Sequence, residues 1–141
     1  MALCAAAVVV LGGCSSAVEI APTSLSDGEV CRDVASAWPA EVGDHARREV
    51  SNASAGAAYG DPPIIARCGV PALGPTTDDC IEVDGVGWVA QKLSDGTRFT
   101  TFGRDPAVEV LIPKDYAPEP LLLPAFSAAA EKLPKNALAC R

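Results

Sequence analysis

Residues 80–113 read CIEVDGVGWVAQKLSDGTRFTTFGRDPAVEVLIP, a run of short apolar or alternating segments separated by turn residues. The segments, at 80–84, 86–93, 97–103 and 108–112, are rich in Val, Ile, Thr and aromatic residues, which is typical of β-strands. The turn motifs between them are Asp84-Gly85, Ser94-Asp95-Gly96 and Arg104-Asp105-Pro106. Because Asp-Gly between two strands is a strong hairpin signal, this region predicts an antiparallel meander.

Helical patterns flank this meander. Residues 64–70 form one further apolar segment, and before them Ser26-Asp27-Gly28-Glu29 has the form of a capping box that would start a helix over 26–38. A second helical stripe, with Pro124 in its first turn, consists of Leu122, Phe126, Ala129, Ala130 and Leu133. We therefore predict an α+β fold, an antiparallel meander of four to five strands with an N-terminal and a C-terminal helix packed on one face.

The region between the first helix and the meander is less regular. Residues 42–50 suggest one edge strand, which carries the only histidine, His45. Residues 52–60 are rich in Ala, Gly and Ser and predict a loop.

The N-terminus resembles a bacterial lipoprotein signal. An apolar run at 2–11 ends in Leu11-Gly12-Gly13-Cys14, which has the form of a lipobox, although no Lys or Arg stands among the first three residues. We predict a signal peptide at 1–13, a lipid-anchored flexible tether at 14–26 and a single domain at 27–141. Lipid on Cys14 would hold the protein at the outer face of the plasma membrane; a plain secretory signal is the alternative.

Cysteine usage agrees with export. Of six cysteines, Cys4 would leave with the signal and Cys14 would carry lipid, and the four that remain are Cys31, Cys68, Cys80 and Cys140. Four cysteines in an exported domain predict two disulfides, with three connectivities open. They are widely spaced and the chain has one histidine, so no metal site is predicted.

Charge excludes other functions. The chain has 18 acidic and 11 basic residues and a net charge of −7, which argues against a nucleic-acid surface and against a polybasic membrane patch. No glycine-rich phosphate loop is present, and we predict no cofactor.

Four residues are candidates for binding: Arg67, Trp88, Arg98 and Arg104. Arginines near an aromatic ring suit a carboxylate, a phosphate or a sugar face. The alternative is structural, with Trp88 packed under a helix and the arginines paired with Asp61, Asp95 and Asp105.

The sequence patterns that would indicate catalysis are weaker than those that indicate binding, and no catalytic residue is assigned. An enzyme would have to use His45, or one of the acidic pairs Asp78-Asp79 and Glu82 with Asp84, together with Arg67 or Arg98. We expect instead a non-catalytic module that binds an envelope protein or a cell-wall ligand. A structural accessory subunit is a third hypothesis.

Several motifs resemble one family, the actinobacterial lipoproteins called domain of unknown function 3515. The similar segments are CR at 31–32, YGDPP at 59–63, RCGVP at 67–71, VDGVGW at 83–88, RFTT at 98–101 and VEV at 108–110. The resemblance implies a cell-envelope lipoprotein and transfers no reaction. It also implies the pairing Cys31–Cys68 with Cys80–Cys140, against the rival Cys68–Cys80 with Cys31–Cys140.

Overall fold

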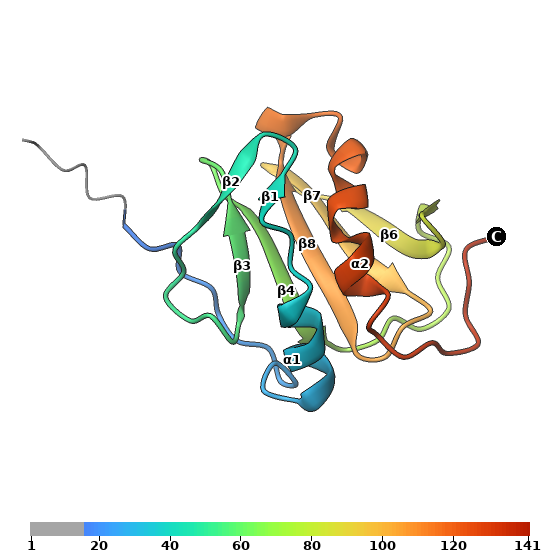
Figure 1. Cartoon of the computed structure of the whole chain (residues 1–141). Coiled ribbons are helices and arrows are strands. Elements are labelled where there is room, and N and C mark those ends of the chain that lie inside the picture. Colours follow the sequence, from blue (N-terminus) through green and yellow to red (C-terminus); the bar gives the residue numbers. More distant parts are fainter. Residues whose placement is uncertain (1–15) are drawn as a thin grey trace, which may run out of the picture.

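The computed structural model describes residues 16–141, so the predicted signal peptide and Cys14 lie outside the described residues. One antiparallel sheet has the order β1-β2-β3-β4-β8-β7-β6-β5 (Figure 1). Its strands are β1 (Glu41–Val42), β2 (His45–Arg48), β3 (Gly56–Tyr59), β4 (Ile64–Val70), β5 (Cys80–Val83), β6 (Val86–Lys92), β7 (Gly96–Phe102) and β8 (Ala107–Pro113). The helices are α1 (Glu29–Ser36), η1 (Lys114–Tyr116), η2 (Glu119–Phe126) and α2 (Ser127–Ala130).

The sheet consists of two successive meanders, β1–β4 and β5–β8, which meet where β4 pairs with β8. The loop at 71–79 carries the chain from β4 in the middle of the sheet to β5 at its edge. The predicted strands at 64–112 are confirmed, as is the α+β class. The predicted number of four to five strands is wrong, because the described chain has an eight-stranded sheet.

One strand, β3, lies where small residues predicted a loop. Residues 52–60 contain β3, in which Ala57, Ala58 and Tyr59 are fully buried. Small residues are needed in this strand, since a Cβ at Gly56 would overlap the carbonyl oxygen of Ala66 on β4. The single edge strand predicted at 42–50 is instead the hairpin of β1 and β2, which turns at Gly43 with φ +60°.

The main core lies between the sheet and the two helical segments that cross one of its faces (Figure 1). Phe126 of η2 is its centre and makes edge-to-face contacts with Trp38 and Tyr59, at ring-centroid distances of 6.3 and 6.0 Å. The Tyr59 hydroxyl donates to the carbonyl oxygen of Pro39 (2.8 Å). Burial raises the pKa of Tyr59 to about 12, against the usual 10.0, because the charged form would lose its hydration.

Both helices differ locally from the prediction. α1 begins at Glu29 after the N-cap Gly28, and the Ser26 hydroxyl donates to the carbonyl of Thr23 instead of capping the helix, so the predicted capping box is wrong. The C-terminal helix spans 119–130 instead of 122–133. Its first eight residues are 3₁₀ and include Pro124, which has no N–H to give to an α-helical bond.

The predicted tether is part of the folded domain from residue 16. Val18 forms a parallel bridge with Val50, and together with Ile20 it is buried in a second, smaller core with Ala55 and Ala58. Along β3 and β4 alternate residues face the helices, so this small core lies on the opposite face of the sheet. The flexible segment predicted at 14–26 is therefore corrected for residues 16–26, and the domain starts well before residue 27.

Two disulfides cross-link the domain. Cys31 on α1 is bonded to Cys68 on β4, and Cys80 at the start of β5 is bonded to Cys140 in the C-terminal tail, with Cα–Cα distances of 5.5 and 5.4 Å. This is the pairing that the family resemblance implied, and the rival pairing of Cys68 with Cys80 is wrong.

Candidate functional site

A charged cluster lies on the face of the sheet away from the helices, beside the part of that face that the N-terminal segment covers with the small core. We call the uncovered part of this face the open face. The cluster consists of Arg67, Glu109 and Arg98, hereafter the arginine cluster, on the adjacent strands β4, β8 and β7. Arg67 Nη2 lies 2.6 Å from Glu109 Oε1, and Arg98 Nε lies 3.3 Å from Glu109 Oε2. One carboxylate thus serves two guanidinium groups, and the cluster keeps one net positive charge.

The strand register brings these three side chains together. Arg67 is directly opposite Glu109, and Arg98 is opposite Leu111, two residues farther along β8. Each of the three lies between two buried residues of its own strand and therefore points away from the core. The buried neighbours are Ala66 and Cys68 on β4, Val108 and Val110 on β8, and Thr97 and Phe99 on β7. The Glu109 side chain is only 9% exposed, whereas those of Arg67 and Arg98 are 24% and 37% exposed. Arg67 donates from Nε and Nη2 to Glu109 and from Nη1 to the carbonyl of Ala21, whereas Arg98 donates from Nη1 to Gln91 at the surface. Arg98 is therefore the arginine of the cluster that a ligand can reach.

An apolar groove adjoins the cluster. Its cavity of ≈ 330 Å³ has an apolar lining that includes Pro62, Pro63, Ile65, Leu93, Leu111 and Pro113. Asp95, Lys114 and Asp115 are the charged residues of its lining. Leu111 pairs with Ile65 on one side and with Arg98 on the other, so the groove and the cluster are continuous on the open face. Such a surface can accept an apolar group in the groove and an anionic group at Arg98.

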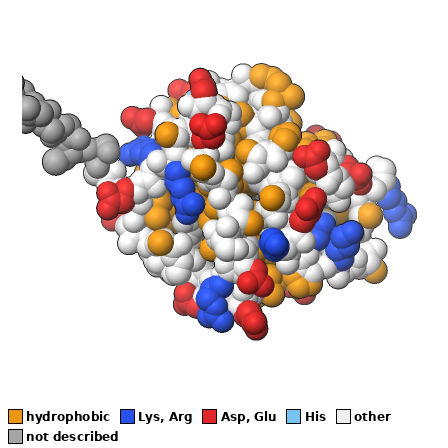
Figure 2. Space-filling model, in the orientation of Figure 1, with side chains coloured by type: hydrophobic (Ala, Val, Ile, Leu, Met, Phe, Trp, Pro, Cys, Tyr) orange, Lys and Arg blue, Asp and Glu red, His pale blue; other side chains and the backbone are white. Residues whose placement is uncertain are grey.

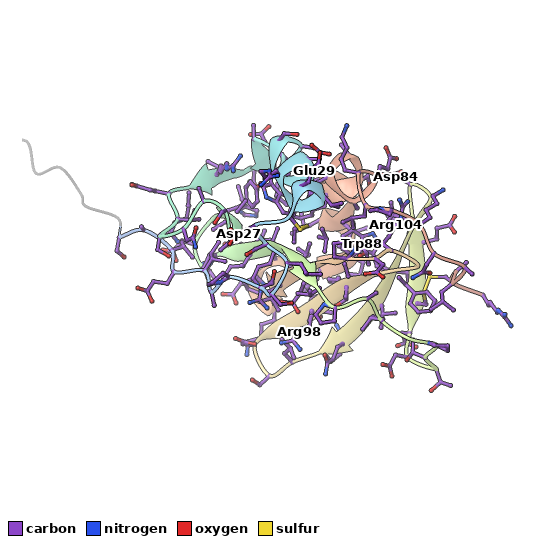
Figure 3. The ribbon with its side chains drawn as sticks, turned by 90° about the horizontal axis from the view of Figure 1, so that it is seen from below. Asp27, Glu29, Asp84, Trp88, Arg98 and Arg104 are labelled. Atoms are coloured by element: carbon purple, nitrogen blue, oxygen red, sulfur yellow. A yellow bond between two sulfur atoms is a disulfide. The ribbon has the colours of Figure 1, made fainter. Side chains whose placement is uncertain are left out.

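The other two candidate residues lie elsewhere. Trp88 is fully buried in the core, on the helix side of the sheet, while Arg98 lies on the far side (Figure 3). Arg104 is 6% exposed and donates from Nη1 to the carbonyl of Leu133 (2.7 Å), just after α2. The predicted four-residue site is therefore reduced to Arg67 and Arg98.

The predicted ion pairs are also corrected. Arg67 and Arg98 both pair with Glu109, not with Asp61, Asp95 or Asp105, and Asp61 lies 3.8 Å from Arg48. Glu109 is not among the site residues that the sequence predicts. Its signal was present in Val108-Glu109-Val110, where a carboxylate interrupts an otherwise apolar strand.

The groups that an enzyme would need do not converge. His45 on β2 is two strand positions from Arg67 and four from Arg98, or about 10 and 19 Å at about 4.8 Å per strand. Glu82 on β5 is two strand positions from Arg98, and its register position on β7 is Phe102, four residues along the strand from Arg98. His45 packs on Tyr116 with a centroid distance of 4.2 Å, and Asp84 accepts a hydrogen bond from Ser127. Burial, followed by the charges of Asp61 and Asp115, raises the pKa of Tyr116. Among residues 16–141 no group of three side chains could hold a metal ion.

We expect Glu109→Gln to lower the free energy of unfolding by about 2 kcal/mol, because the two guanidinium groups would lose a nearly buried carboxylate. Urea denaturation measures the change. Glu131→Gln is the matched control, since Glu131 is exposed at the end of α2 and should change stability by less than about 0.5 kcal/mol. Equal stability of the two variants would show that the cluster contributes nothing to the fold.

On the face that the helices cover, acidic and basic side chains are interspersed (Figure 2). Among the described residues, this face therefore offers no patch of a single charge to a ligand.

No helix described in residues 16–141 is long and apolar enough to cross a membrane.

The disulfides and the sequence family indicate the class of protein to which the chain belongs. Two disulfides in a small α+β domain are typical of an extracytoplasmic protein. The chain belongs to the family described as protein of unknown function (DUF3515), which it matches over residues 1–138. No curated protein and no solved structure matches it.

Proposed function

We propose that the chain is an exported lipoprotein, anchored through lipid on Cys14 at the outer face of the plasma membrane, and that it acts there as a non-catalytic binding module. The lipobox form of residues 11–14 supports the anchor. The cysteine count supports it further, because after residue 13 only Cys14 stands outside the two disulfides.

The open face supports the binding role. It joins the apolar groove to the arginine cluster, in which the Arg98 side chain is 37% exposed. This combination suits an envelope protein or cell-wall ligand that carries a carboxylate or phosphate beside an apolar group. The strand register that places Arg98 directly opposite Leu111, a lining residue of the groove, is the observation that carries the proposal.

The test is purification of the tagged, lipidated protein from detergent-solubilised envelope, followed by mass spectrometry. We expect a diacylglyceryl group on Cys14 and a stoichiometric partner or ligand whose recovery falls at least tenfold with Arg98→Gln. This variant leaves the Arg67–Glu109 pair in place. Arg32→Gln is the matched control, because Arg32 is an exposed arginine on α1.

Two results would count against the proposal. A protein without lipid at Cys14 would remove the anchor. A bound partner that is lost equally with Arg32→Gln and Arg98→Gln, or with neither, would remove the open face as the binding surface.

A further inference from the structure

The N-terminal segment of the domain is tied down almost to the proposed anchor. Arg48 Nη2 donates to the carbonyl oxygen of Ser16 (3.3 Å). The Val18 N–H donates to Glu49, and the Ser51 N–H donates to Val18, both at 2.9 Å. Val18 and Ile20 are 8% and 5% exposed. The chain is therefore attached to the edge of the sheet from Ser16 onward.

Because the chain is attached to the sheet from Ser16 onward, very little chain separates the domain from Cys14. Cys14 precedes Ser16 by two residues, which span at most about 7 Å when fully extended. A lipid on Cys14 would keep that residue at the membrane interface, whose headgroup layer is about 5–8 Å thick. Ser16 can therefore lie no more than about 7 Å from an anchor that is itself held at the headgroups.

We propose that the domain sits directly on the bilayer, and that lipid headgroups contact the edge formed by residues 46–51 and 60–61, which we call the anchor edge. The proposal rests on the lipid at Cys14. Arg48 joins the parts of this edge, because its guanidinium binds the carbonyls of both Ser16 and Gly60. The opposite edge of the sheet, β5, is six strand positions away from β2, or about 29 Å.

The short chain between the lipid-bearing Cys14 and Ser16 determines this contact, and electrostatic attraction to the membrane does not. The anchor edge carries Arg47 and Arg48, but these are balanced by Glu49 and Asp61. A surface without excess positive charge gains little from anionic lipids. We therefore expect the same contact on neutral phosphatidylcholine as on anionic membranes.

The contact with the headgroups also fixes where the candidate binding site lies relative to the membrane. Pro62 and Pro63 of the groove directly follow Asp61 of the anchor edge. The apolar end of the open face therefore lies near the membrane, while Cys80–Cys140 at the β5 edge lies away from it.

The experiment uses the mature chain with both disulfides intact, so that Cys14 is its only free thiol. Cys14 is coupled to a maleimide phospholipid in phosphatidylcholine vesicles that also contain a lipid with a spin-labelled headgroup. A fluorescent coumarin amino acid replaces Glu49 in one variant and Glu82 in another. Both positions are exposed, the first on the anchor edge and the second on β5.

We expect headgroup quenching at position 49 to be at least threefold stronger than at position 82. Insertion of ten Gly and Ser residues between Cys14 and Ser15 adds about 17 Å of average reach and should reduce quenching at 49 to the level at 82. Val18→Ser with Ile20→Ser should act in the same direction, because it releases the segment that these residues bury.

Equal quenching at positions 49 and 82, unchanged by the insertion, would overturn the proposal. Quenching at 49 only in anionic vesicles would also overturn it, because charge and not reach would then make the contact. Chemical coupling supplies the anchor in this experiment, so its failure is distinct from a failure to find lipid on Cys14 in the cell.

Discussion

Phe126→Ala is expected to lower the free energy of unfolding by about 4 kcal/mol. Phe126 is fully buried in the main core, in edge-to-face contact with Trp38 and Tyr59. Alanine would lose the apolar transfer energy and both aromatic contacts, and it would leave a cavity that this closely packed core cannot refill. Chemical denaturation followed by tryptophan fluorescence measures the loss.

Leu121→Ala is the control for this variant. Leu121 lies in the same helix, η2, but is 72% exposed, so its truncation should change stability by less than about 0.5 kcal/mol. Similar losses in the two variants would mean that η2 is not packed against the sheet through Phe126.

Removal of the Cys31–Cys68 bridge is the second large effect. We expect Cys31→Ala with Cys68→Ala to lower the free energy of unfolding by about 4 kcal/mol, because the unfolded chain regains the entropy of a loop that spans 37 residues. Both cysteines are buried, at 3% and 4% exposure, so packing between α1 and β4 is lost as well. Denaturation without reductant measures the change.

The other bridge provides the comparison. Cys80→Ala with Cys140→Ala opens a longer loop, across 60 residues, but the freed tail can then detach from the folded domain too. Because the native state gains part of the same freedom, we expect a smaller loss, about 2 kcal/mol. A larger loss of unfolding free energy on removal of Cys80–Cys140 than on removal of Cys31–Cys68 would contradict the expectation that the Cys31–Cys68 bridge stabilises the domain more.

Local patterns predicted most of the sheet. Residues 80–113 alternate and carry Asp84-Gly85, where both residues adopt positive φ, so their hairpin depends on neighbours in sequence. β3 escaped prediction because its burial comes from its position between β2 and β4, not from large apolar side chains. The same reason explains residues 16–26, where Val18 and Ile20 are buried only because the folded chain brings Ala55 and Ala58 against them.

The candidate site was predicted in part. Arg67 and Arg98 are conspicuous as cations on predicted strands, but their common partner Glu109 depends on β4 and β7 both flanking β8. Because the chain crosses from β4 to the far edge before it returns, no local pattern indicates that neighbourhood. Trp88 and Arg104 are on equally plausible strands or turns, yet Trp88 packs in the main core and Arg104 is covered by the C-terminal segment at 133–135.

By itself, the sequence determined the α+β class, the hairpins of the second meander and a cysteine set suited to two disulfides, because turns and alternation act over a few residues. The tertiary structure decided the eight-stranded order, the neighbours of Glu109 and the attachment of the N-terminal segment. These depend on which distant strands pair, and that choice follows from the burial of the whole chain and not from any one stretch of it.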